Sequence, residues 1–234
     1  MKTKLVENKN ISDEVSNNNN NSLYLNKNNT PNINNKKITL SINSSAYKFC
    51  QNINEINNQN ENGYTPVYSS ILDENIQALN ELLLLGANPN LPNNLGETPL
   101  YLSVDKSNLD ALIILLQYNA DCNIITKKGN TPLHLAIQNN EENIIQILLR
   151  NNANPNIKDN LNGQTATHLA IINKYDEDIL NLLKENKADI FNVKDKFCKT
   201  PLDYAKESKD ENYINLILKI FGKNNNNINN NYAE

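Results

Sequence analysis

The sequence predicts an all-α protein, a solenoid of about five helix-turn-helix units with hairpin fingers between them. The first observation is a Thr-Pro pair, or a variant of it, that recurs at intervals near 33 residues. The second is a short segment centred on Ala, which keeps the same period. The third is a turn that ends in Gly shortly before most of the Thr-Pro pairs. Markers that stay in step along the chain are far more specific than any one of them alone.

Each Thr-Pro pair marks the start of a helix. The Thr oxygen caps free N–H groups, and Pro suits the first helical position because it has no N–H. In the third unit, a short apolar helix (133–137) is followed by a polar break and a second amphipathic helix (144–151) with apolar residues at helical spacing. The pairs stand at Thr65-Pro66, Thr98-Pro99, Thr131-Pro132, Thr165-Ala166 and Thr200-Pro201.

The second helix of a unit ends at Gly86, Asn119 or Asn152, residue types that tolerate left-handed backbone. The Ala that follows in the first four units predicts close packing against the neighbouring unit; these residues are Ala87, Ala120, Ala153 and Ala188. Between units lies a turn whose final Gly permits the positive φ of a projecting hairpin. The turns read NENG (60–63), NNLG (93–96), TKKG (126–129) and NLNG (160–163).

The segment Thr131-Pro132-Leu133-His134-Leu135-Ala136 resembles the T-P-L-H-x-A signature of the ankyrin repeat. The resemblance covers five units, about residues 60 to 222. It implies a right-angled stack of helix pairs with hairpin fingers, in which the concave face made by fingers and first helices usually binds another protein. It also implies that His134 and His168 hydrogen-bond locally and bridge adjacent repeats through their two ring nitrogens.

Two units depart from the repeat pattern. The fourth has Ala166 and Thr167 in place of Pro and Leu, and one extra residue in its turn. The fifth has Cys198 in place of the turn Gly, so we expect the hairpin before Thr200 to be irregular. The histidine position holds other polar groups able to hydrogen-bond in the remaining units, namely Tyr68, Tyr101 and Asp203.

The predicted boundaries place an ankyrin-repeat domain at 46–222 between two Asn-rich tails, 1–45 and 223–234. We expect the tails to be disordered because such segments cannot bury enough apolar surface. Compositional drift is the favoured explanation of these tails, and a recruitment or phase-separation role is the alternative. The repeats are expected at about 60–92, 93–125, 126–159, 160–194 and 195–222.

Both ends of the stack need a cap. At the C-terminal end, the segment 211–221 predicts a capping helix that stops at Gly222. At the N-terminal end, a helix is expected at about 46–57, with the alternative that this stretch belongs to the tail. Its apolar face would carry Ala46, Phe49, Cys50, Ile53 and Ile56.

Several classes of function are disfavoured by the sequence. The net charge of −4 argues against wrapping nucleic acid, and no apolar run reaches the length of a membrane span. No catalytic, cofactor or metal site is expected. The three cysteines (Cys50, Cys122 and Cys198) lack metal-type spacing and predict free thiols in the cytoplasm or nucleus.

The candidate partner-binding residues are those that vary between units on the fingers and on the exposed side of the first helices. They are Leu95, Glu97, Asp105, Lys106, Lys127, Lys128, Asn130, Gln138, Asn139, Leu161, Gln164, Ile172, Asn173, Lys196, Phe197 and Lys199, with Asn94, Asn162 and Glu207 beside them. Apolar finger tips in a row are typical of an interface, although single exposed apolar residues are common. The lysines favour an acidic partner, or are simply solvated.

The function predicted from the sequence is that of a non-enzymatic, monomeric interaction module that binds a partner protein on the concave surface. It would act as an adaptor, an assembly chaperone or an inhibitor. One alternative is an effector delivered into a host cell, where it binds a host protein through the same surface. A second is a structural role carried by the Asn tracts.

Overall fold

A computed structural model describes Lys48 and residues 53–222. The predictions for the two Asn-rich tails, and for most of the N-terminal cap helix, lie outside the described residues. Within them the chain forms a 3-10 helix, η2 (Ile53–Glu55), and ten α-helices, with no β-structure beyond one isolated bridge between Lys158 and Thr165. The predicted all-α class is therefore confirmed.

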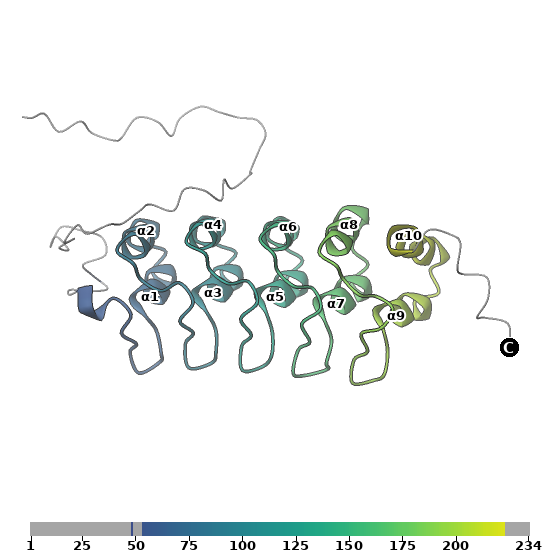
Figure 1. Ribbon diagram of the computed structural model, residues 1–234, viewed down its shortest axis with the longest axis horizontal. Helices are drawn as coiled ribbons and strands as arrows, with labels where there is room; N and C mark the ends of the chain where they lie inside the picture. Colours follow the sequence, from purple (N-terminus) through teal and green to yellow (C-terminus); the bar gives the residue numbers. More distant parts are fainter. Residues whose placement is uncertain (1–47, 49–52, 223–234) are drawn as a thin grey trace, which may run out of the picture. The chain divides into compact units, whose positions relative to one another are not determined.

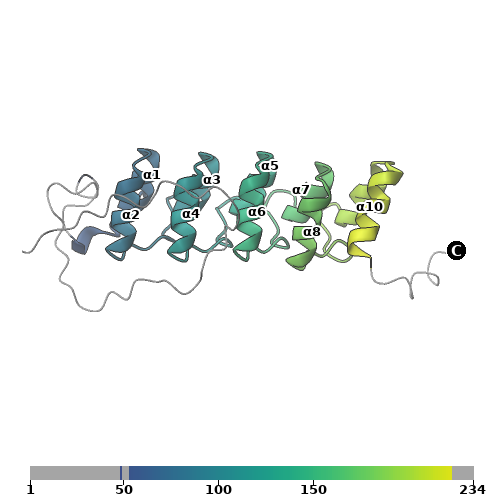
Figure 2. The same cartoon turned by 90° about the horizontal axis from the view of Figure 1, so that it is seen from above.

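The helices alternate between two layers of the stack (Figure 1). The first helices of the five units are α1 (Pro66–Leu72), α3 (Pro99–Asp105), α5 (Pro132–Gln138), α7 (Ala166–Ile172) and α9 (Pro201–Glu207). The second helices are α2 (Ile76–Leu84), α4 (Leu109–Gln117), α6 (Glu142–Arg150), α8 (Glu177–Glu185) and α10 (Glu211–Phe221). The first helices pack against one another along the whole stack, and in most units the first helix also packs against the second helix, as α1 does against α2. Figure 2 shows the second helices side by side in chain order.

The core lies between these two layers and runs without a break through the stack. It is built mainly from Leu, Ile, Val and Ala, including the fully buried Leu82, Leu115, Leu148 and Leu183 of successive second helices. Because each unit buries its apolar surface against its neighbours, the units are stable only as a stack. Cys122 belongs to this core, and its burial raises the pKa of its thiol to about 12, so a structural role fits it.

The helix starts follow the chemistry that the sequence predicts. In every unit the Thr side chain accepts a hydrogen bond from the backbone N–H three residues later, as from Tyr68 to Thr65. A polar side chain caps the second helix in the same way in four units, through Asn75, Asn108, Asp176 and Asp210. These caps satisfy N–H groups that have no partner inside the helix.

The two histidines have the bridging role that the family resemblance implies. The Nδ1 atom of His134 accepts a hydrogen bond from the Thr131 backbone N–H (3.2 Å), and its Nε2 atom lies 3.3 Å from the Gln164 carbonyl of the next unit. His168 does the same with Thr165 (3.1 Å) and Lys199 (3.1 Å). Since Nδ1 accepts, the proton of each neutral ring sits on Nε2 and is donated to the next repeat. The histidines join the third, fourth and fifth units.

The histidine position in the other units also forms hydrogen bonds. Asp203 accepts from the backbone N–H of Thr200 (2.9 Å) and from its hydroxyl (2.8 Å), which closes the same capping box. The Tyr68 hydroxyl instead accepts from the Asn93 side chain of the second unit (2.9 Å) and donates to Glu97 (3.3 Å). Different side chains at this position therefore either cap the first helix or hydrogen-bond to the next unit.

The histidine bridges predict acid sensitivity. Burial lowers the pKa of His134 and of His168, so both rings are neutral in the folded chain, whereas the unfolded chain binds protons below a pKa of about 6.5. Stability is therefore complete above about pH 6.5 and falls as the pH drops toward the lowered folded-state pKa. The free energy of unfolding should decrease by up to about 1.4 kcal/mol per pH unit for each histidine. Urea titrations at about pH 7 and about pH 5 measure this, and equal midpoints would contradict it.

The fingers between units are tied to one another by main-chain hydrogen bonds. The backbone N–H of Lys127 donates to the Leu95 carbonyl (2.9 Å), and that of Asn160 donates to Lys128 (3.0 Å). This approach is so close that a Cβ atom on Gly129 would lie 2.3 Å from the nitrogen of Asn160. The turn glycines thus provide positive φ, as predicted, and also room for the next finger.

The prediction of an irregular fifth hairpin is wrong. Cys198 adopts the left-handed backbone (φ 61°) of the turn glycines, and the finger closes through the same pair of bonds, from Asp195 to Lys199 and from Cys198 to Asp195. A side chain is accommodated here because no further finger follows in the described residues. The residues that the fourth unit has beyond the 33-residue period lie outside the fifth finger, in the fourth finger and around α8. The extra residue in the loop before α8 allows Tyr175 to enter the core, where its hydroxyl donates to the Ile137 carbonyl (3.0 Å).

Asparagine builds a ladder through the repeats at the ends of the second helices. The side-chain oxygens of Asn57, Asn90, Asn123 and Asn156 accept from a backbone N–H of the following unit, at Asn88 (2.8 Å), Asp121 (2.8 Å), Asn154 (2.7 Å) and Asp189 (2.9 Å). This ladder was not predicted from the sequence, although its members recur every 33 residues. Much of the Asn in the repeats is therefore structural.

At the N-terminal end, the described part of the predicted cap helix is the short 3-10 helix η2 rather than an α-helix. The next residue, Ile56, is buried in the core, and Asn57 begins the asparagine ladder. This segment therefore packs on the first unit through the Ile56 side chain and the hydrogen bond of Asn57. At the other end α10 ends at Gly222, as predicted.

Candidate protein-binding face

The finger face consists of the five fingers and the first helices above them. Each finger is closed by a main-chain hydrogen bond between its first and last residues, which defines the fingers as 60–64, 93–97, 126–130, 159–164 and 195–199. The side chain that opens a finger also accepts backbone N–H groups inside it. Asn93 accepts from Leu95 (2.8 Å) and Glu97 (3.0 Å), and Asp195 accepts from Phe197 (2.8 Å) and Lys199 (3.0 Å). The fingers are therefore rigid in themselves and in register with one another.

Most of the candidate residues lie exposed on this face. The finger tips Leu95, Leu161 and Phe197 are 61%, 76% and 62% exposed, respectively. Lys127, Lys128 and Lys196 are exposed on the same fingers. The remaining exposed candidates lie at the C-terminal ends of the first helices and in the loops that follow them; they are Asp105, Lys106, Gln138, Asn139, Ile172 and Asn173.

Gln164 is a correction, because it is only 8% exposed. Its side-chain amide donates to the Tyr204 hydroxyl (3.2 Å), which in turn donates to Asp195 (2.6 Å). Burial alone would raise the pKa of Asp195, but the hydrogen bonds from Tyr204 and from two backbone N–H groups lower it. Gln164 therefore joins the fourth and fifth units, and its side chain contributes little free surface.

Three other candidates are half-buried and already have partners within the chain. Glu97 accepts from Asn93 (2.8 Å), and Lys199 pairs with Glu207 (2.8 Å) while its Nζ atom lies 5.2 Å from the centre of the Tyr204 ring. Asn130 donates its backbone N–H to the Thr126 hydroxyl (3.2 Å). Their polar groups have a structural role whether or not they also contact a partner.

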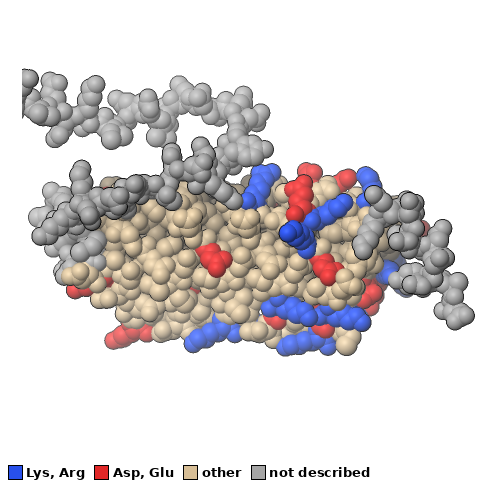
Figure 3. Space-filling model, in the orientation of Figure 1, with Lys and Arg blue, Asp and Glu red and all other residues tan. Residues whose placement is uncertain are grey.

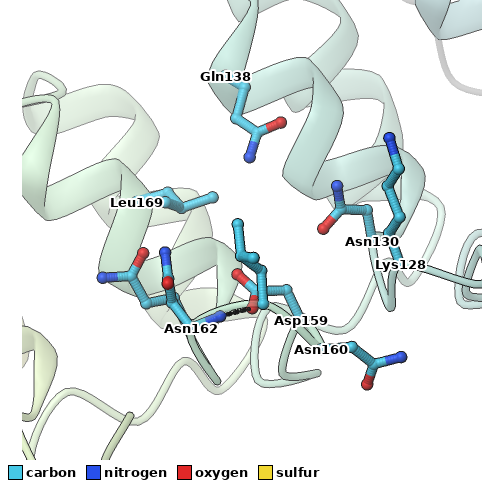
Figure 4. A pocket seen from close by; sticks show the side chains of 9 residues that line it. Lys128, Asn130, Gln138, Asp159, Asn160, Asn162 and Leu169 are labelled. Carbon is cyan, nitrogen blue, oxygen red and sulfur yellow. Dashed lines mark hydrogen bonds between the residues drawn. The ribbon is translucent and has the colours of Figure 1, made fainter. Parts of the chain in front are cut away.

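Several candidates of the third and fourth units line one hollow of about 460 Å³. It is lined by Lys128, Asn130, Gln138, Asp159, Asn160, Leu161, Asn162, Gln164 and Leu169. Figure 4 shows Gln138 of α5 and Leu169 of α7 on opposite sides of the hollow, with Lys128 and Asn130 on the third finger. The structure thus brings together residues that the sequence places more than 30 positions apart.

Two lysines of the finger face were missed by sequence reasoning. Lys158 and Lys194 are exposed and come directly before the fourth and fifth fingers. The repeated pair Lys-Asp (Lys158-Asp159 and Lys194-Asp195) could have identified them, since both occur at the same place in the repeat. Figure 3 shows basic side chains gathered along the lower right edge of the molecule, where the fingers of the last units lie in Figure 1.

Neither a metal-ion site nor a bilayer-spanning helix is present in the described part of the chain. Residues 53–222 contain no group of three or more His, Cys, Asp or Glu side chains placed to hold a metal ion. Among the helices of the same residues, none has the length and apolar character needed to span a bilayer.

Comparison with known proteins agrees with the repeat architecture. A family profile described as "Ankyrin repeats (3 copies)" matches residues 38–126, 70–159 and 133–231. The chain belongs to the ankyrin repeat family. Its fold is similar to the crystal structure of an ankyrin repeat domain from Acinetobacter baumannii, with a TM-score of 0.62 and 28% sequence identity over 70% of this chain and 85% of that one. No curated protein matches the chain significantly. Ankyrin repeats are generally protein–protein interaction modules.

Proposed function

We propose that this ankyrin-repeat chain is a non-enzymatic module that binds a partner protein through its finger face. The observation that carries the proposal is the row of hydrogen-bonded fingers with the exposed apolar tips Leu95, Leu161 and Phe197. Large apolar side chains held in a row outside the core mark interaction surfaces. The hollow beside Leu161 offers a concave seat for a partner side chain.

The module acts by presenting a rigid binding surface that is already formed before the partner arrives. Main-chain bonds between fingers, histidine bridges and the asparagine ladder fix the spacing of the units before a partner arrives. Little conformational entropy is then lost on binding, so more of the contact free energy appears as affinity. Acting as an adaptor, an assembly chaperone or an inhibitor, the protein would work by holding or covering its partner.

The test is capture of the partner by the full chain and by the double variant Leu161→Asp, Phe197→Asp. Both side chains are exposed, so the variant should keep its helicity, and its free energy of unfolding should stay within about 0.5 kcal/mol of that of the original chain. Because two apolar contacts become charged, the protein retained by the original chain should bind the variant at least about tenfold more weakly.

The control is the pair Leu84→Asp, Leu218→Asp. These residues are also exposed but lie on α2 and α10, in the layer of second helices. This control should retain the partner as the original chain does. Equal binding by all three proteins would contradict the finger face as the binding surface.

A reducing compartment, cytoplasm or nucleus, is part of the proposal. It is supported by Cys122 and Cys198, both of which are free thiols. Delivery into a host cell is the alternative that would use the same surface. Detection of the protein outside the cells that produce it would favour that alternative.

A further inference from the structure

We propose that the fingers of the third, fourth and fifth units bind an acidic segment of the partner protein, with one apolar side chain of that segment seated in the hollow beside Leu161. This inference rests on the proposed function and specifies the chemistry of the partner. It is carried by the charge and shape of the finger face, which differ along the stack.

Positive charge dominates the exposed surface of these three fingers. Their exposed charged side chains, with the residue before each finger included, are Lys127, Lys128, Lys158, Lys194 and Lys196. The carboxylates of the same segments, Asp159 and Asp195, are each only 7% exposed and accept backbone N–H groups of their own fingers. A partner that meets these fingers therefore meets lysine rather than carboxylate.

The first two fingers have the opposite character. The chain contains no Lys or Arg from residue 49 to residue 105, and the first two fingers carry Glu61 and Glu97. The basic region is thus local in a chain whose net charge is −4. Complementary charge steers association and fixes the register of a partner, so this asymmetry selects an acidic segment for the later fingers.

The hollow between the third and fourth units provides the apolar part of the site. Leu161 and Leu169 lie in its lining, whereas Lys128, Asn130 and Gln138 surround them with polar groups. A volume of about 460 Å³ is ample for one Leu-sized or Phe-sized side chain. An apolar anchor within a polar rim is the arrangement that gives most binding free energy in protein interfaces.

The spacing of the lysines is set before binding. The Lys158 ammonium donates to the Lys194 carbonyl (2.7 Å), and the Lys196 ammonium donates to the Asn160 (2.6 Å) and Leu161 (2.9 Å) carbonyls. These bonds connect the fourth and fifth fingers. A single extended segment that crosses the fingers can therefore meet positive charge at successive steps.

A protein segment fits this surface better than a nucleic acid, which is also a polyanion. The exposed apolar tips Leu161 and Phe197 stand among the lysines, and a phosphate backbone offers them no apolar partner. A nucleic acid that continued along the row would meet Glu61 and Glu97, which repel phosphate.

Selection from a random peptide library displayed on phage tests the proposal with the full chain as bait. The enriched peptides should share Asp or Glu residues around a Leu, Ile, Met or Phe. The consensus peptide, made with a fluorescent label, should bind the chain with an affinity that falls as salt is raised. The same peptide with Lys in place of its acidic residues should not bind.

Charge reversal locates the site. Lys127→Glu with Lys128→Glu should weaken binding of the consensus peptide about tenfold or more. Arg150→Glu with Lys184→Glu changes the net charge equally but lies on α6 and α8, so the affinity should change by less than about twofold. Leu161→Ser should weaken binding of the consensus peptide but leave the salt dependence of that binding unchanged, because it removes only the apolar part of the site.

Several results would overturn the proposal: enrichment of basic peptides, no enrichment at all, or equal binding by the two charge-reversed pairs. Binding of a labelled single-stranded oligonucleotide in preference to the consensus peptide would assign these lysines to nucleic acid instead. The proposed function fails separately. If the Leu161→Asp, Phe197→Asp variant loses the captured partner while the library yields no acidic consensus, the finger face binds protein but not through acidic residues.

Discussion

Replacing Gly129 by Ala is expected to lower the free energy of unfolding by about 3 kcal/mol or more. Left-handed backbone at φ +84° costs a residue with a Cβ atom about 1–2 kcal/mol. The added Cβ atom would also lie 2.3 Å from the backbone nitrogen of Asn160, so the fourth finger must move and its hydrogen bond to Lys128 must lengthen or break. Urea denaturation followed by circular dichroism measures the loss.

Gly86→Ala separates the two causes. Gly86 has a similar backbone conformation, φ +93°, but a Cβ atom there would have no neighbour within 4 Å. It should therefore lose only the backbone contribution, about 1–2 kcal/mol. Cys198→Gly should change stability by less than about 1 kcal/mol, because relief of the left-handed strain is offset by a more flexible unfolded chain. If Gly129→Ala and Gly86→Ala lowered the free energy of unfolding equally, the close approach of the fingers would not contribute to the loss at Gly129.

His134→Leu is expected to cost about 3 kcal/mol at neutral pH. The substitution fits the volume of the site but leaves the buried Thr131 N–H without an acceptor, and it removes one of the two donors to the Gln164 carbonyl, which keeps its bond from the Asp159 N–H. Each buried polar group left without a partner costs about 1–3 kcal/mol. The same variant should also lose part of the decrease in stability between about pH 7 and about pH 5, because one of the two neutral histidines is gone.

The matched control for His134→Leu is Gln138→Leu on the same helix. Gln138 is exposed at the C-terminal end of α5, so its replacement should alter the free energy of unfolding by about 0.5 kcal/mol at most. If His134→Leu were as stable as this control, the bridge between the third and fourth units would have no energetic role.

The sequence predicts the repeat well because each marker is a local backbone requirement. A helix start is stabilised by a cap such as Thr131 and by a Pro at its first position such as Pro132, and a projecting turn needs positive φ at a residue such as Gly129. Such requirements can be read from single residues and their period. These requirements predicted the five units and their helices, whereas the bridging role of the histidines was implied by the resemblance to the ankyrin repeat.

What the sequence did not predict depends on contacts between units. Cys198 differs from the turn glycines by a Cβ atom, and whether that atom is tolerated depends on whether another finger packs against it. The burial of Gln164 depends on Tyr204, which lies in the next unit, 40 residues later. The asparagine ladder has the period of the repeat, but its hydrogen bonds appear only once the units are stacked. The residues around an Asn or Gln in the sequence do not show which group of a neighbouring unit it will hydrogen-bond.

Amide hydrogen exchange of the full chain, alone and with the partner that it captures, tests the central claim most directly. If the finger face binds the partner, exchange should slow in 126–139, 158–173 and 194–207, which span the later fingers and the first helices that follow them. Exchange in the second helices α4, α6 and α8 should not change. Protection confined to those second helices, with the fingers unaffected, would contradict the account.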